Sequence, residues 1–316
     1  MSESSIPVAD VRDWHGDPDA RARFVRSVGE SLADTGFFAL SHYGISAELT
    51  QQAYQVARAF YQLPRETKQR FHQPGAKGQR GYTGFGTERA KDTTTPDLKE
   101  FWQVGRVDVP DAHEVHAPYG PNVWPDDVVA QFQPVMAELY RGLDALGRVC
   151  LEACALFLDE PPATFADMVD QSDTIVRVIY YPPTVGAPPG AVRSAAHEDI
   201  NLITLLSGAT SEGLELLARD GTWTPIHVSF DHIVVDAGDM LQNLTNGLYK
   251  STTHRVVNPR DAASDRYSMP CFIHPRKAVD LTPMPSAIAR TGGVARYPSL
   301  TAGEYLEKRL REIGLG

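Results

Sequence analysis

Residues 174–181 read Thr-Ile-Val-Arg-Val-Ile-Tyr-Tyr, and residues 197–206 read His-Glu-Asp-Ile-Asn-Leu-Ile-Thr-Leu-Leu. Both stretches belong to a region of short β-rich runs that Gly, Pro, Asn or Asp mostly separates. Short strands at this spacing predict a β-sandwich or jelly roll and not alternating βαβ units. The runs span 174–181, 201–206, 214–218, 223–228, 233–235, 240–244, 249–257 and 266–274.

Helical patterns dominate the first 160 residues. Apolar residues recur at four-residue steps from Phe24 to Leu32 behind an N-cap at Asp17, which predicts a helix ending near Gly36. The same reasoning predicts a strand at 37–40, a helix from Ser46 to Pro64, a strand at 99–104 within loops spanning 75–120, a long helix at 125–158 and a C-terminal helix at 299–313.

The chain has 316 residues, which is typical of two domains, although a β-barrel or sandwich often exceeds 200 residues as one unit. The change from helical to β-rich patterns divides it. We therefore expect a mainly β protein with flanking helices in three parts. These are an N-terminal helical and mixed region packed on the barrel (1–165), a jelly-roll core (166–280) and a C-terminal segment with its helix (281–316).

Composition excludes several classes of protein. Apolar residues make up 42% and charged residues 22%, which is typical of a folded globular chain. The net charge is −10 without a Lys/Arg run, so we expect no nucleic-acid partner. A polar N-terminus and the absence of an 18-residue apolar stretch predict a cytoplasmic protein without a membrane partner. Of three cysteines, Cys150 and Cys154 lie one helical turn apart, which favours a buried helix face over a disulfide framework.

The triplet His197-Glu198-Asp199, together with His254 further along the chain, is the first candidate for chemistry. Residues two apart on a strand share a face, so His197 and Asp199 can converge while Glu198 points away. Two imidazoles and one carboxylate leave open positions on an octahedral ion, as in non-haem Fe(II) oxygenases. The alternative is a strand-end His and Asp that face water, with His254 hydrogen-bonded in the barrel.

Arg266 and Ser268 are the second candidate. They also share one strand face, where a guanidinium fork and a hydroxyl can bind a carboxylate. An ordinary solvent-facing arginine is the alternative. Because Arg266 follows His254 closely in the sequence, a ligand anchored by Arg266 could reach a metal at His254.

Several further stretches make the chain resemble a known family, the isopenicillin N synthase-like branch of the Fe(II)/2-oxoglutarate-dependent oxygenases. The resemblance extends from Ile6 to beyond Pro275. Its most specific part is 238–247 (GDMLQNLTNG), which leads into 251–256 (STTHRV). The other matching stretches are 6–10 (IPVAD), 35–38 (TGFF), 42–45 (HYGI) and 177–183 (RVIYYPP).

This resemblance implies a double-stranded β-helix with iron bound by His197, Asp199 and His254. It further implies that Arg266 and Ser268 bind the cosubstrate carboxylate and that Tyr181 helps to hold the cosubstrate. The implied activity is oxidation of an organic substrate (hydroxylation, desaturation or cyclisation) with O2 and 2-oxoglutarate, which releases succinate and CO2. The sequence specifies neither the primary substrate nor the oligomeric state.

Two departures and three alternatives accompany this interpretation. Glu198 replaces the family's frequent Thr, and Ile179 stands where Asn is common. Some members keep the same Arg and Ser but bind the substrate's carboxylate there, so an oxidase that uses no 2-oxoglutarate is one alternative. A non-catalytic barrel that binds a small acid is another. Zinc hydrolysis is the third, but the chain lacks a helical H-E-x-x-H arrangement.

The substrate pocket is expected between the barrel mouth and a glycine-rich loop at 81–86, which lacks the pattern of a phosphate loop. Tyr82, Phe85 and Trp102 precede the barrel, and Phe272 shares the strand face of Arg266. They predict a pocket for a small organic molecule with apolar surface. For each of these aromatics, ordinary core packing is the alternative.

Overall fold

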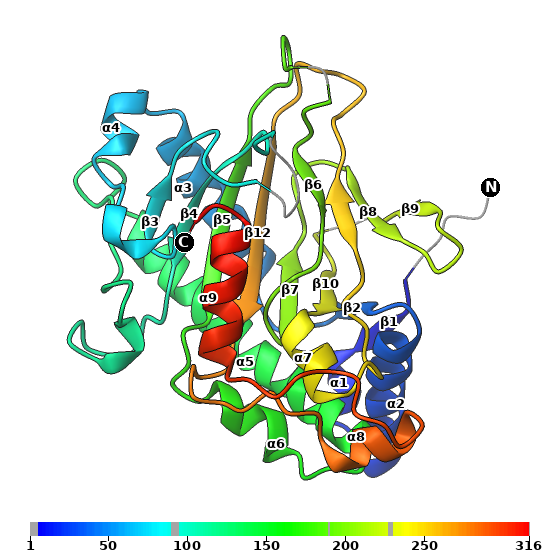
Figure 1. Cartoon of the computed structure of the whole chain (residues 1–316). Helices are drawn as coiled ribbons and strands as arrows, with labels where there is room; N and C mark the ends of the chain where they lie inside the picture. The colour runs from blue at the N-terminus through cyan, green and yellow to red at the C-terminus, as the bar shows by residue number, and fades with distance from the viewer. Residues whose placement is uncertain (1–5, 90–94, 189, 227–229, 316) are drawn as a thin grey trace.

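Two β-sheets form the centre of the computed structural model, which describes residues 6–89, 95–188, 190–226 and 230–315 (Figure 1). The larger sheet has the order β1-β2-β10-β7-β12-β5-β4-β3, and the smaller one has the order β6-β11-β8-β9. The strands are β1 (Val8–Asp10), β2 (Phe37–Ser41), β3 (Gly81–Thr83), β4 (Glu100–Val104), β5 (Ile175–Tyr181), β6 (Ser194–His197), β7 (Ile203–Ser207), β8 (Leu214–Leu217), β9 (Trp223–Pro225), β10 (Ile233–Ala237), β11 (His254–Val256) and β12 (Arg266–Ile273).

Helices flank the sheets, and the N-caps expected at Asp17 and Ser46 are present. Both side chains accept a hydrogen bond from a backbone N–H of the first turn. The α-helices are α1 (Val11–Trp14), α2 (Pro18–Asp34), α3 (Ala47–Tyr61), α4 (Arg65–Gln69), α5 (Phe132–Phe157), α6 (Ala163–Ala166), α7 (Asp239–Leu244), α8 (Pro285–Arg290) and α9 (Ala302–Glu312). Short 3₁₀ turns lie at Pro74–Ala76, Glu114–His116 and Asp167–Val169.

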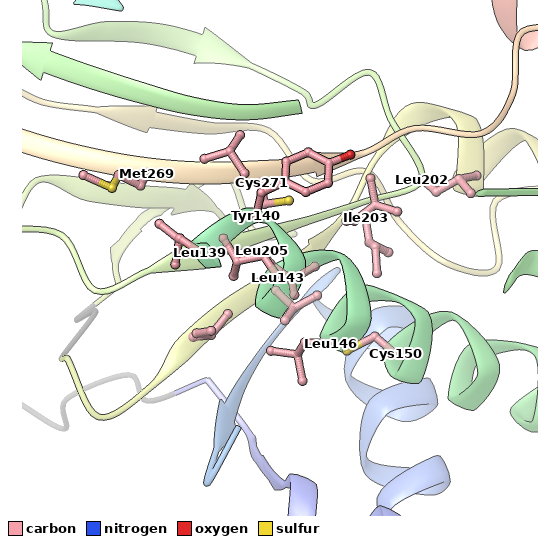
Figure 2. Packing of buried hydrophobic residues seen from close by; sticks show 14 of the residues in the cluster. Leu139, Tyr140, Leu143, Leu146, Cys150, Leu202, Ile203, Leu205, Met269 and Cys271 are labelled. Atoms are coloured by element: carbon pink, nitrogen blue, oxygen red, sulfur yellow. The ribbon is translucent and has the colours of Figure 1, made fainter. Parts of the chain in front are cut away.

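The long helix α5 packs its apolar stripe against the larger sheet (Figure 2). Leu139 and Leu143 lie near Leu205 of β7 in Figure 2, and Gly147 of the helix packs against Ile273 of β12. Cys150 and Cys154 are buried on this helix and form no disulfide, as expected from their spacing. The helix therefore supports the centre of the sheet from the side opposite the cavity described below.

The architecture confirms a mainly β fold with flanking helices and a jelly-roll core. Strand β12 lies between β7 and β5 and pairs antiparallel with both. Strands β1 to β4, which come from the first 165 residues, extend the same large sheet. The N-terminal region thus contributes edge strands to the core sheet as well as helices. None of the helices in the described part of the chain is both long and apolar enough to cross a membrane.

One expected strand is wrong. Residues 240–244 lie in helix α7, where Met240, Leu241 and Leu244 are buried on one face. Their spacing suits a helical period, but a short apolar run does not distinguish strand from helix by itself. Strands β1, β3 and β6 are not among the expected strands, and the expected strand at 249–257 is limited to β11. Residues 1–5 of the polar N-terminus and residues 227–228 of the expected strand at 223–228 lie outside the described residues.

Candidate active site

His197, Asp199 and His254 converge between the two sheets. His197 ends β6 and pairs in register with His254 at the start of β11, while Asp199 follows β6. One potential ligand atom from each residue lies within 4.8 Å of the other two. Nε2 of His197 is 3.8 Å and Nε2 of His254 is 3.7 Å from Oδ1 of Asp199. This arrangement can hold a single metal ion.

Backbone carbonyls orient both imidazoles. Nδ1 of His197 lies 2.7 Å from the carbonyl oxygen of Ala195, and Nδ1 of His254 lies 3.1 Å from that of Thr252. A carbonyl oxygen only accepts, so each Nδ1 carries the proton and each Nε2 keeps a lone pair. Burial and the adjacent His254 lower the pKa of His197 to about 4. The His197 ring is therefore in the neutral form that a metal requires.

Strand β7 and helix α7 hold Asp199. The Thr204 hydroxyl donates to Oδ2 of Asp199, which leaves Oδ1 beside the two imidazoles. The backbone N–H of Asp239 donates to the carbonyl oxygen of Asp199 at 2.7 Å. Glu198 instead accepts a hydrogen bond from the Thr253 hydroxyl. Asp199 and not Glu198 is thus the carboxylate of this cluster.

Arg266, Ser268 and Tyr181 lie together on one face of the larger sheet. Arg266 pairs in register with Tyr181 across β12 and β5, and Ser268 is the next residue of β12 on that face. The Arg266 side chain is buried, and its guanidinium carbon lies 5.0 Å from the centre of the Tyr181 ring. Nε donates to the carbonyl oxygen of Ser211, but Nη1 has no partner among the described residues.

A cavity of about 390 Å³ joins the two groups of residues. Alternate residues of β12, from Arg266 to His274 just beyond the strand, line one wall, and β6 and β11 line the opposite one. Leu306 and Leu310 of α9 close another side. The helix lies in front of β5 and β12 in Figure 1. A buried, unpartnered guanidinium N–H and three convergent potential ligand atoms therefore share one cavity.

A buried group of charges that the sequence analysis missed forms another part of this wall. Nζ of Lys99 lies 2.7 Å from Glu88 and 2.9 Å from Asp97, and Arg177 contacts Glu88 at 3.0 Å. Although burial opposes ionisation, Arg177 and Lys99 lower the pKa of Glu88 to about 2. The two cations of this group are balanced by its two carboxylates. Only its position on β5 and in the segment before β4 brings it to the cavity, and no local sequence pattern marks it.

Comparison with known proteins assigns the family. Residues 6–127 match the family described as non-haem dioxygenase in morphine synthesis N-terminal, and residues 172–275 match the 2OG-Fe(II) oxygenase superfamily. The 2-oxoglutarate-dependent dioxygenase caaD of Aspergillus niger is 30% identical over 279 residues, which cover 87% of this chain and 85% of caaD. The chain belongs to the Fe(II)/2-oxoglutarate-dependent oxygenases. It is of the isopenicillin N synthase-like type and is a non-haem dioxygenase that uses Fe(II), 2-oxoglutarate and O2.

Solved structures of this oxygenase family share the whole fold. A 2OG-Fe(II) oxygenase family protein from Caulobacter crescentus is 37% identical with a TM-score of 0.85, covering 98% of this chain and 99% of that one. A full-length Neurospora crassa protein, solved in complex with alpha-KG and thymine, is 27% identical with a TM-score of 0.85, covering 98% of both chains.

The residues of this oxygenase fit its cofactors. The donor set of two imidazoles and a carboxylate suits Fe(II), and the free Nη1 of Arg266 suits one end of a dicarboxylate. Arg193 lies near Arg266, and its burial and the neighbouring charge of Arg266 lower the pKa of Arg193. An anion beside Arg266 would offset this repulsion between the two guanidinium groups.

The residues expected to line the substrate pocket divide into two sets. Phe272 lines the cavity, as its strand parity with Arg266 predicted. Tyr82 and Trp102 lie in the hydrophobic core with Phe60 and do not line the cavity that the described residues form. Phe85 is 52% exposed and also lies outside that lining. For Tyr82 and Trp102 the structure therefore supports core packing, because both rings pack against Phe60 of α3 and Trp102 also packs against Phe132 of α5.

Replacing Tyr82 with Ala should lower the free energy of unfolding by about 3–5 kcal/mol, as for other large buried aromatics. The ring packs against Phe60 at 5.8 Å, and its hydroxyl donates to Glu100, which also pairs with Lys68 at 2.6 Å. Urea denaturation followed by circular dichroism measures the loss. Tyr82→Phe, which keeps the ring, should lose less. A Tyr82→Ala protein as stable as wild type would contradict the core position.

Proposed function

We propose that His197, Asp199 and His254 bind Fe(II), that Arg266, Ser268 and Tyr181 bind 2-oxoglutarate, and that a small organic substrate is oxidised in the adjoining cavity. The observation that carries this proposal is one cavity lined by both the three converging residues and Arg266 with its unpartnered Nη1. A metal and an anion held there would lie side by side.

The protein contributes binding, orientation and exclusion of water. When bound, Fe(II) and 2-oxoglutarate supply the oxidising chemistry, in which O2 is consumed and succinate and CO2 are released. The carbonyls of Ala195 and Thr252 keep the imidazoles in the ligating tautomer, and Thr204 fixes the orientation of Asp199. The apolar side chains of α9 limit access of water to the cavity.

Two features support a small-molecule substrate. The cavity of about 390 Å³ falls within the range of small-ligand sites, and Phe272 adds apolar surface next to the buried charges. The Neurospora crassa protein, which is 27% identical to this chain, holds thymine in its complex. Hydroxylation, desaturation and cyclisation are all compatible with such a site. The three-part division of the chain and its cytoplasmic location stay predictions.

Substrate-dependent succinate release from 2-oxoglutarate tests the proposal. With a substrate found in a small-molecule screen, Phe272→Ala should lower kcat/KM about tenfold, because the variant removes apolar contact surface from the cavity wall. Phe85→Ala is the matched control and should behave as wild type because this ring is largely exposed and outside the cavity lining. No Fe(II)-dependent succinate release in any reaction would refute the proposed chemistry. Equal kcat/KM for Phe272→Ala and wild type would refute the pocket assignment.

A further inference from the structure

His274 is a residue of the cavity wall to which neither the cofactors nor the ion pairs assign a role. It follows β12 directly and has the parity of Arg266, Ser268 and Phe272, all of which line the cavity. It also lines a second cavity of about 470 Å³, with which the first shares Gln79, His274 and Leu306. The imidazole therefore lies where the two spaces meet.

Its hydrogen bonding is incomplete. His274 is 9% exposed, and Nδ1 has no hydrogen-bond partner among the described residues. A buried polar atom without a partner costs free energy, so such atoms mark places where water or a ligand completes the bonding. Burial lowers the pKa of His274 to about 4 against the opposing charges of Asp173 and Asp199, while Arg177 adds to the lowering. The ring is neutral at ordinary pH and offers one donor and one acceptor.

The position of His274 relative to the ligand cluster follows from the strand register. Thr204, which donates to Asp199, pairs in register with Phe272. The ligand cluster therefore lies near the level of Phe272, and Arg266 lies further back along the same strand. His274 is the next inward-facing residue after Phe272, on the side away from Arg266. A molecule whose oxidised carbon lies beside the metal can reach His274 without displacing the cosubstrate from Arg266.

Three cations of this wall already have carboxylate partners. Lys99 contacts Glu88 and Asp97, Arg177 contacts Glu88, and Arg309 of α9 contacts Glu312 at 3.0 Å. Arg89, which also lines the cavity, is an exposed residue. A substrate carboxylate would have to compete with these carboxylates for their cations. An uncharged substrate group does not have to displace a protein carboxylate from its cation. A neutral imidazole can donate a hydrogen bond to such a group or accept one from it.

We infer that His274 is a specificity-determining residue and that the primary substrate is an uncharged small molecule with a hydrogen-bonding group, such as an amide, ketone or hydroxyl, directed at this ring. This inference deepens the proposed function and rests on it. Phe272 contacts the apolar part of the molecule, and His274 binds its polar edge.

A six-compound panel tests the inference in the Fe(II)-loaded protein with 2-oxoglutarate. Thymine, 2-piperidone and cyclohexanone are the uncharged members, and orotate, benzoate and cyclohexanecarboxylate carry a carboxylate. We expect at least one uncharged compound to accelerate succinate release more than any carboxylate. With that compound, His274→Phe should lower kcat/KM about tenfold, mainly through KM, because a hydrogen bond is lost while the ring volume is kept. His274→Asn, which keeps a donor and an acceptor, should recover to within about threefold of wild type.

His116→Phe provides the matched control. His116 is also buried with an unpartnered Nδ1, but it lines neither cavity among the described residues. Its substitution should leave KM for the active compound unchanged. Should His274→Phe fail to fold, ring-nitrogen NMR of wild-type protein loaded with Zn(II) and 2-oxoglutarate replaces it, and the His274 signal should shift when the active compound is added.

Three results would overturn the inference: acceleration by carboxylates alone, no acceleration by any of the six compounds, or a His274 variant or signal that does not respond. Substrate-independent release of succinate separates these failures from a failure of the proposed function. If that basal release is present, only the substrate assignment is lost. If it is absent with Fe(II) and 2-oxoglutarate supplied, the proposed function itself is refuted.

Discussion

Replacing Asp199 or His254 with Ala is expected to abolish Fe(II)-dependent turnover while the protein stays folded. Each change removes one of three ligand atoms that lie within 4.8 Å of one another. Loss of a residue that only orients a ligand typically costs 10- to 100-fold in metal affinity or activity, so loss of the ligand itself should cost about a hundredfold or more. The hydrophobic core on α5 does not include these side chains, so far-UV circular dichroism should be unchanged.

Bound iron after anaerobic gel filtration and succinate release together measure the effect. Glu198→Ala is the matched control, because Glu198 lies between the ligands in sequence but bonds the Thr253 hydroxyl. This control should retain iron. If Asp199→Ala or His254→Ala kept wild-type turnover with iron, the assignment of that ligand would be wrong.

The sequence predicted the ligand cluster better than the reason for its geometry. We expected His197 and Asp199 to share a face of one strand, but β6 ends at His197. Asp199 reaches the cluster because Thr204 and the N–H of Asp239 hold the turn after β6. These contacts come from β7 and α7, and the spacing within the triplet gives no information about them. The prediction that Arg266, Ser268 and Phe272 share one face of β12 rests on a better basis, since a long regular strand preserves the alternation of its faces.

The sequence alone does not distinguish aromatic residues of the core from those of the pocket. Tyr82, Trp102 and Phe272 all have large apolar rings. Such a ring is favoured both in a hydrophobic core and in the wall of an apolar pocket, so its type does not tell the two apart. Phe272 could be assigned because its strand contains the recognisable pair Arg266 and Ser268. Tyr82 and Trp102 pair in register on β3 and β4, and only the pairing of β4 with β5 joins these two strands to the rest of the sheet. Helix α7 was missed for a related reason, since a run of five residues fits either period.

Replacing Arg266 with Leu is expected to raise the apparent KM for 2-oxoglutarate by about 10- to 100-fold, with a much smaller effect on iron affinity. A charge-assisted bond from a guanidinium to a carboxylate contributes about 1.5–3 kcal/mol, which corresponds to this range. Arg266 is 1% exposed, so its carboxylate contact would be shielded from water. The side chain contributes no ligand atom to the metal cluster, which is why iron binding should persist.

Initial rates of succinate release over a range of 2-oxoglutarate concentrations, together with an iron titration, separate the two effects. Arg266→Lys should be intermediate because it keeps the charge but loses the planar fork. Arg106→Leu removes another buried arginine, one that bonds Asp144 and the Ser172 carbonyl outside the cavity lining, so it should leave the KM for 2-oxoglutarate unchanged even if stability falls. An Arg266→Leu enzyme with wild-type dependence on 2-oxoglutarate would mean that this guanidinium binds a different anion. The carboxylate of the primary substrate would be the first candidate, and the uncharged substrate inferred from His274 would then have to be abandoned as well.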